Sequence, residues 1–263
     1  MSEHAIISNQ LETPHSTTGE VDLPCGLIRD GALITKAFVR EISGHEEDML
    51  ASDKIKPITK LTELISKCVI KLGDITDREF IAKAAREMTI GDRAWLILAI
   101  RRRTLGDIFP YTEVCPNAAC KVKRLFQVNL ADLEARKMAD PMRRLYEVEL
   151  PVCGKSARFH VMTGADEEEI SKYQTDLISR ALHVRLEMIG DRKPSLDEVK
   201  GLSMRDRDTL RSVIDDVEGG VDTEIEMTCA DCGIEFSREL DIGQQGFFFP
   251  SRAQSRSKKK SSS

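Results

Sequence analysis

Apolar and polar residues alternate along two neighbouring segments near the start of the chain, 21–28 and 32–42. A period of two predicts β-strands, and the turn residues Asp30-Gly31 between the segments predict a hairpin. The same pattern returns in segments 145–152 and 157–162, which flank a second turn. Each half of the chain is therefore expected to begin with a β-hairpin.

Helical patterns follow each predicted hairpin. They cover residues 60–72 and 77–88 in the first half and 166–189 in the second. The last helix of each half is the most clearly marked, because Thr89 and Ser203 stand where an N-cap hydroxyl accepts hydrogen bonds from free backbone N–H groups. Glycines are expected to end these two helices, namely Gly106, Gly219 and Gly220.

The order of landmarks in the first half recurs in the second. Four groups match in sequence: 21–24 with 148–151, 42–48 with 162–168, 63–67 with 176–180, and 89–93 with 203–207. Each series then ends in a pair of cysteines. Matches that keep one order along the chain indicate a duplicated unit, so we predict two tandem repeats.

The two cysteine pairs are Cys115 with Cys120 and Cys229 with Cys232. A strand is predicted on either side of each pair, and a strand, tight turn and strand form half of a zinc ribbon. Zinc in structural sites takes four ligands in a tetrahedron, so the two pairs together complete one structural site with no open position. The alternatives are two unconnected thiol pairs or redox-active pairs. Redox chemistry is disfavoured because neither pair lies where a strand runs into a helix.

Composition limits the class of protein. The chain has 263 residues, 41% hydrophobic and 32% charged, with a net charge of -5. No apolar run approaches the roughly 20 residues of a membrane-spanning helix, and the polar N-terminus lacks the pattern of a secretory signal. We therefore expect a cytoplasmic protein whose cysteines are thiols or metal ligands rather than disulfides. The acidic body disfavours nucleic-acid binding, which relies on Lys and Arg.

Motifs for catalysis fail on inspection. Residues 154–156 (GKS) resemble the end of a phosphate-binding loop, but Glu149 replaces the required upstream glycine and the segment lies in a predicted hairpin turn. The acidic clusters at 46–48 and 167–169 begin predicted helices, which indicates solvated capping charges rather than paired catalytic acids. We predict that the protein is not an enzyme.

The remaining cysteines and the histidines carry less information. Cys25 and Cys153 lie at similar positions after a Leu-Pro pair. The pattern favours small buried residues there, with a second metal pair as the alternative. Cys68 is expected in the core. The histidines lack ligand spacing and are expected to be surface or hydrogen-bonded polar residues.

Three of the nine phenylalanines stand together, at Phe247, Phe248 and Phe249. Each aromatic side chain buries about 150–250 Å², so exposing three of them would be unfavourable. The sequence leaves two alternatives open. The segment either folds back over the ribbon or anchors in a partner, which makes these three residues candidates for partner binding.

Short strings along most of the chain carry a family likeness. They are 23–26 (LPCG), 39–48 (VREISGHEED), Asp92-Arg93, 105–107 (LGD), 229–233 (CADCG) and 247–250 (FFFP). Over about residues 21–250 the chain resembles the T-even-type phage baseplate (hub assembly) family. The resemblance implies a non-enzymatic structural or assembly component of a phage tail or contractile injection system baseplate. Other baseplate or tail-hub proteins would be its partners, in the cytoplasm or in the virion baseplate.

Two other function classes stay open. A zinc-ribbon nucleic-acid adaptor would use the ribbon and the basic tail at residues 252–263. The acidic body counts against this alternative. A metalloenzyme would require zinc with an open coordination position.

Together these patterns predict an α+β fold of two tandem hairpin-plus-helices repeats joined by a split zinc ribbon. The predicted boundaries are a disordered N-terminal arm at 1–20, repeats at 21–132 and 140–245, and an aromatic segment with a basic disordered tail at 246–263.

Overall fold

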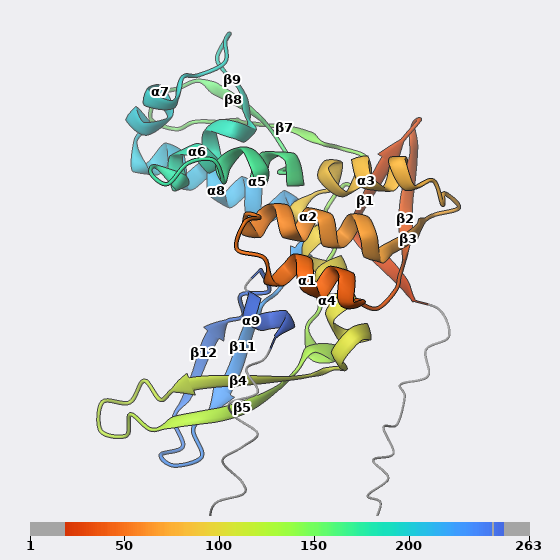
Figure 1. Ribbon diagram of the computed structural model, residues 1–263. Coiled ribbons are helices and arrows are strands. Elements are labelled where there is room, and N and C mark those ends of the chain that lie inside the picture. Colours follow the sequence, from red (N-terminus) through yellow and green to blue (C-terminus); the bar gives the residue numbers. More distant parts are fainter. Residues whose placement is uncertain (1–18, 244, 250–263) are drawn as a thin grey trace, which may run out of the picture.

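The computed structural model describes residues 19–243 and 245–249. The protein is mixed α+β, as the sequence predicts, and its sheets are small and antiparallel (Figure 1). Most of the predicted arm at 1–20 and of the predicted tail at 246–263 lies outside the described residues.

The first half combines a three-stranded sheet, a group of helices and a two-stranded ribbon. In chain order its elements are β1 (Glu20–Arg29), β2 (Ala32–Val39), α1 (Gly44–Ala51), α2 (Pro57–Cys68), β3 (Val69–Leu72), α3 (Arg78–Glu87), α4 (Ile90–Leu105), β4 (Ile108–Val114) and β5 (Lys123–Asn129). The sheet has the order β1-β2-β3, and β4 pairs with β5.

The second half follows the same order of elements. They are β7 (Leu145–Glu149), β8 (Ser156–His160), α5 (Gly164–Ile170), α6 (Leu177–Arg185), β9 (Leu186–Ile189), α7 (Leu196–Gly201), α8 (Met204–Val217), β11 (Glu224–Thr228) and β12 (Glu235–Glu239). Its sheet has the order β7-β8-β9, and β11 pairs with β12. Short elements complete the described chain: the 3-10 helix η1 (Leu130–Asp132), β6 (Ala135–Arg136), β10 (Gly220–Val221) and α9 (Gln245–Phe248).

The first hairpin forms as predicted. Arg29 pairs with Ala32, so Asp30 and Gly31 make a two-residue turn. Their φ angles are 50° and 77°. Positive φ at both central residues matches the right-handed twist of the strands and is easiest for Asp, Asn or Gly.

Two predicted helices end earlier than the sequence pattern indicates. Residues 69–72 form β3, which pairs with β2. The segment 166–189 contains α5, α6 and β9, and β9 pairs with β8. In both halves the segment adds a third strand to the hairpin, so cross-strand pairing overrides the helical periodicity.

The starts of α4 and α8 are built alike. Both predicted N-caps are confirmed, since Thr89 accepts a hydrogen bond from Asp92 N–H at 3.2 Å and Ser203 accepts one from Asp206 N–H at 3.1 Å. The two aspartates are buried. Each Oδ1 accepts a backbone N–H from just after the Leu-Pro pair of its own hairpin, at 2.8 Å and 2.7 Å respectively. These bonds tie each helix to the sheet of its own half.

The arginine after each aspartate also makes matching contacts. Arg93 and Arg207 are both buried. Each donates from Nη1 to a carbonyl of the preceding helix and from Nη2 to a hydroxyl of the helix before that. The acceptors are Ala85 O and Thr62 Oγ1 (3.1 Å) for Arg93, and Val199 O (2.9 Å) and Ser179 Oγ (3.1 Å) for Arg207.

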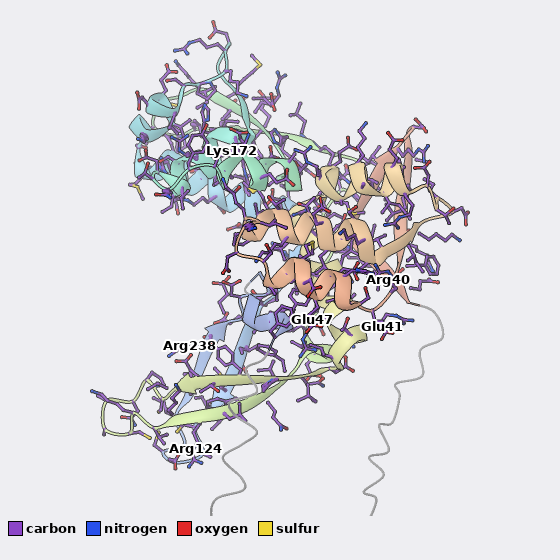
Figure 2. The ribbon with its side chains drawn as sticks, in the orientation of Figure 1. Arg40, Glu41, Glu47, Arg124, Lys172 and Arg238 are labelled. Carbon is purple, nitrogen blue, oxygen red and sulfur yellow. The ribbon has the colours of Figure 1, made fainter. Side chains whose placement is uncertain are left out.

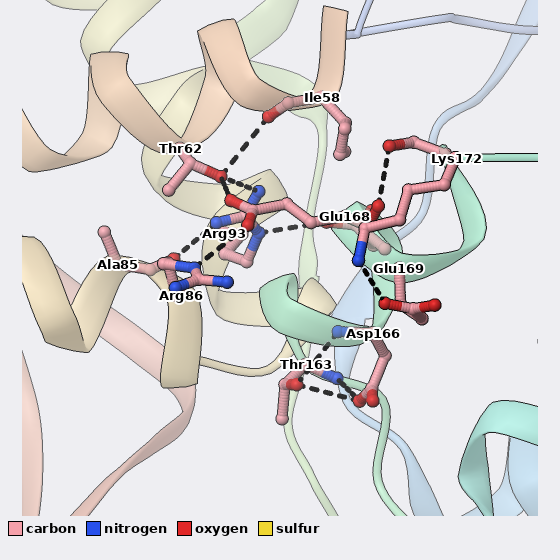
Figure 3. A network of polar contacts seen from close by, with 12 residues as sticks. Ile58, Thr62, Ala85, Arg86, Arg93, Thr163, Asp166, Glu168, Glu169 and Lys172 are labelled. Atoms are coloured by element: carbon pink, nitrogen blue, oxygen red, sulfur yellow. Dashed lines mark hydrogen bonds and ion pairs between the residues drawn. The ribbon is translucent and has the colours of Figure 1, made fainter. Parts of the chain in front are cut away.

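The two halves meet where α5 contacts α2, α3 and α4 (Figure 3). Arg93 Nε donates to Glu167 at 3.0 Å, and Arg86 Nε donates to Glu168 at 2.9 Å. The prediction that these two carboxylates are solvated is therefore wrong, because arginines from the other half bind them. Burial raises the pKa of Glu167, and Arg93 opposes that shift.

Close backbone packing completes the contact between the halves. A Cβ on Gly91 would meet Gly219 O at 2.3 Å, so α4 can approach the end of the second half only with glycine there. The sequence predicts that Gly219-Gly220 ends α8. The structure ends that helix at Val217, with Glu218 as the C-cap. Gly219 lies outside the helix, where a Cβ would meet Met138 N at 2.7 Å and Arg136 O at 2.8 Å.

Acidic residues close the capping boxes of α1 and α5, and each has a basic partner. Arg40 Nη2 lies 2.9 Å from Glu46 Oε1, and His160 Nε2 lies 3.1 Å from Asp166 Oδ2. The hydrogen bond from Arg40 lowers the pKa of Glu46 to about 2. The hydrogen bond to Asp166 raises the pKa of His160 above its ordinary 6.5. Glu46 is 3% exposed, so the prediction of a solvated charge is wrong here too.

The stabilisation from His160 is expected to disappear at alkaline pH. Because its folded-state pKa is raised, the contribution is full below about pH 6.5 and is lost as the pH rises through the folded-state value. Urea unfolding should show the wild type about 1 kcal/mol more stable than His160→Gln at pH 6, and the two nearly equal at about pH 9. A stability gap that stays constant with pH would contradict this assignment.

Candidate metal centre

Four cysteines come together from the end loops of the two β-ribbons. Figure 1 shows the ribbons, β4 with β5 and β11 with β12, extending side by side. Cys115 and Cys120 lie in the loop between β4 and β5, and Cys229 and Cys232 lie in the loop between β11 and β12. The first cysteine of each pair donates its backbone N–H across its loop at 2.9 Å. The acceptors are Val122 O and Ile234 O. The two loops therefore begin with the same hydrogen bond.

The four sulfur atoms lie close enough together to bind one metal ion. All four Sγ atoms lie within 4.8 Å of one another. Cys115 Sγ lies 3.6 Å from Cys232 Sγ, and Cys120 Sγ lies 3.9 Å from Cys229 Sγ. Four thiolates about 2.3 Å from one ion would stand about 3.8 Å apart. A disulfide needs about 2.05 Å, and all four are free thiols.

The backbones of the two loops turn alike, but their surroundings act differently on the thiols. The residue after the second cysteine of each pair has positive φ, 46° at Lys121 and 72° at Gly233. A hydrogen bond from Ile234 N–H lowers the pKa of Cys232 to about 7. Burial raises the pKa of Cys115 to about 12. A metal ion that binds all four sulfurs would displace the remaining thiol protons.

Side chains also join the two ribbons, beyond the cysteines. The pairs are Phe126 with Phe236, edge to face at 5.9 Å between ring centroids, Arg124 with Asp231 at 2.7 Å, and Arg238 with Glu113 at 3.6 Å. Figure 2 shows Arg124 near the ribbon tips and Arg238 further along. Sequence reasoning missed these contacts, since no local pattern links partners such as Arg124 and Asp231, which are 107 residues apart.

The other cysteines do not join the site. Cys25 is 1% exposed and Cys68 is 0% exposed, whereas Cys153 is exposed. Burial raises the pKa of Cys25 and of Cys68 to about 11. The prediction for Cys68 is confirmed, and so is burial at Cys25. The prediction of a buried residue is wrong for Cys153, and neither Cys25 nor Cys153 belongs to the four-cysteine group.

The phenylalanine segment folds back on the protein. Phe247 and Phe248 are 1% and 4% exposed, and Phe249 packs against the same core. The Phe247 ring lies 5.3 Å from that of Phe109 at the base of the first ribbon, and Arg101 Nε of α4 donates to Phe247 O at 2.9 Å. The partner-binding prediction is therefore wrong for Phe247 and Phe248, because the chain itself covers them.

Comparison with known proteins found no match. The chain matches no family model, and the searches of curated proteins and of solved structures gave no match. Within the part of the chain that the structure describes, no helix has the length and apolar character needed to cross a membrane.

Proposed function

We propose that this protein is a non-enzymatic structural or assembly component of a phage tail or contractile injection system baseplate. In this proposal one zinc ion, bound by Cys115, Cys120, Cys229 and Cys232, joins the end of the first half to the end of the second. The observation that carries the metal site in this proposal is that four sulfurs, from two ribbons far apart in sequence, lie within 4.8 Å of one another.

Zinc is the proposed metal because of the donor set. Four thiolates in a tetrahedron select zinc or an iron–sulfur centre among the common metals. The cysteine spacing and the two matching loops are those of a zinc ribbon. Metal analysis of the purified protein is expected to find one zinc per chain and no iron. Iron together with visible absorbance would exclude zinc.

A structural role follows from the ligand count. Four protein ligands fill the zinc coordination sphere, so water and substrate have no position on the metal. The two ribbons extend together from the helical part of the molecule as an arm (Figure 1). A metal that fixes such an arm suits a part that must hold its shape while it docks to neighbours. That these neighbours belong to a baseplate is inferred from the resemblance to the baseplate family.

Fractionation of producing cells tests the assembly role. Lysate is separated on a sedimentation gradient and the protein is quantified across it by mass spectrometry. Co-migration with tube, sheath and baseplate proteins at a fixed ratio identifies a resident component. Light fractions that contain one or two baseplate proteins identify an assembly factor. Co-migration with ribosomes or nucleic acid would overturn the proposal in favour of a nucleic-acid adaptor.

A further inference from the structure

The contact between the two halves provides a template for a second contact. In it the first turn of α5 lies on α3 and α4 (Figure 3). Backbone bonds join Gly164 N–H to Met88 O and Ile90 N–H to Met162 O, both at 3.0 Å. A Cβ on Gly164 would meet Arg93 Nη1 at 2.5 Å, so a larger residue in this turn would displace the buried guanidinium.

The second half presents the counterpart of the surface that α5 covers in the first half. Arg207 matches Arg93, but among the described residues it has no carboxylate partner, although it is 7% exposed. Lys200 stands where Arg86 binds Glu168, and Met204, which stands where Ile90 lies, is 69% exposed. We call Ser179, Lys200, Met204 and Arg207 the α8 docking surface. On this surface Lys200 pairs with Asp176 at 2.8 Å, Met204 is an exposed apolar side chain, and Arg207 Nε has no acceptor among the described residues.

The first half presents the counterpart of the turn that does the covering. The first turn of α1, with Gly44 and Glu47, matches the first turn of α5, with Gly164 and Glu167, and both turns carry a capping box. Glu47 is exposed. A Cβ on Gly44 would meet nothing within 4 Å, so no contact among the described residues requires glycine at this position.

We propose that copies of this chain associate head to tail, with the first turn of α1 in one copy seated on the α8 docking surface of the next. Glu47 would bind Arg207, as Glu167 binds Arg93, and Gly44 would cross the guanidinium as Gly164 does. The charges are complementary, because Glu47 meets Arg207, which has no carboxylate partner among the described residues. The proposal uses no ribbon residue and does not depend on zinc or on the baseplate assignment.

The two surfaces lie on different parts of one chain, so an α1 turn that binds the α8 docking surface comes from a second copy. In Figure 1, α1 lies beside α2, whereas α6 and α7 lie at the far end of the other half. The association should be weaker than the internal contact. Arg205 replaces Gly91 at the position that packs on Gly219, so a second copy cannot approach as closely. A contact between two different surfaces builds a ring or an open chain.

Sedimentation velocity on the full chain, from about 1 µM to about 1 mM, tests the proposal. The wild type is expected to associate as its concentration rises. Glu47→Arg reverses the charge of the α1 turn, and Met204→Asp adds an acid to the docking surface in the first turn of α8, where acids favour the helix. Each variant alone should weaken association at least about tenfold. Gly44→Ala should weaken it as well, and unchanged thermal melts would show that folding is intact.

An equimolar mixture of Glu47→Arg and Met204→Asp gives the decisive measurement. Each partner retains the surface that the other lacks, so the mixture should regain association through one wild-type contact, beginning with a one-to-one dimer. His45→Ala is the matched control, since the equivalent Ala165 stays exposed in the internal contact. A wild type that is monomeric throughout, association that survives either variant alone, or a mixture that remains monomeric would each overturn the proposal.

Discussion

Replacing Cys229 and Cys232 together by serine is expected to release the metal and to abolish cooperative thermal unfolding of the ribbon arm. Structural zinc contributes an apparent ~10–16 kcal/mol of binding free energy, which is comparable with the whole stability of a typical domain. In this protein the effect should extend beyond the loops, because the arm shares its core with the helices. Ile225 and Met227 of β11 belong to the same buried cluster as α4. Circular dichroism melts and metal analysis of the two proteins measure the loss.

Cys153→Ser is the matched control for the double variant. It removes a thiol that is exposed and lies outside the four-cysteine group. It should therefore keep the full metal content and an unchanged melting temperature. Titration of the wild type with a chelator should cause the same metal loss and the same loss of cooperative unfolding as the double variant. If the Cys229→Ser/Cys232→Ser protein melts normally and is incorporated normally into particles, the metal does not hold the two ribbons together.

The four-cysteine group could be predicted from sequence because its determinants are local. Two cysteines a few residues apart between predicted strands define a chelating loop, wherever the rest of the chain runs. The hairpin turn at Asp30-Gly31 and the caps Thr89 and Ser203 are local in the same sense. In each case a backbone conformation or a hydrogen bond within a few residues selects the amino acid.

The errors of prediction arise where the partner is distant. Residues 69–72 become a strand only because β2 offers an edge to pair with. Glu167 has the spacing of a capping charge, and its arginine lies 74 residues earlier in the chain. Phe247 finds its cover on α4 and β4, so its burial is a property of the fold and not of its segment. A sequence pattern states that such a residue needs a partner but does not identify it.

Arg93→Met is expected to lower the free energy of unfolding by about 3–5 kcal/mol, the range for breaking one side of a buried ion pair. The guanidinium is 2% exposed and joins the helices of the first half to Glu167 of the second. Its loss leaves that carboxylate without its partner, and the pKa of Glu167, already raised by burial, should rise further. The deficit should therefore grow as the pH increases above about 4.5, because an acid with a raised folded-state pKa destabilises the fold when it ionises.

Arg207→Met supplies the comparison, since Arg207 makes the matching bonds within its own half and binds no carboxylate among the described residues. At concentrations where the chain is monomeric, this substitution should lower the free energy of unfolding by only about 1–3 kcal/mol, because it leaves buried acceptors unsatisfied. Urea unfolding of both variants, each with and without Glu167→Gln, isolates the ion pair. Glu167→Gln should recover part of the loss in Arg93→Met and none in Arg207→Met. Equal losses in the two arginine variants would mean that Arg93 stabilises its own half alone and does not join the two halves.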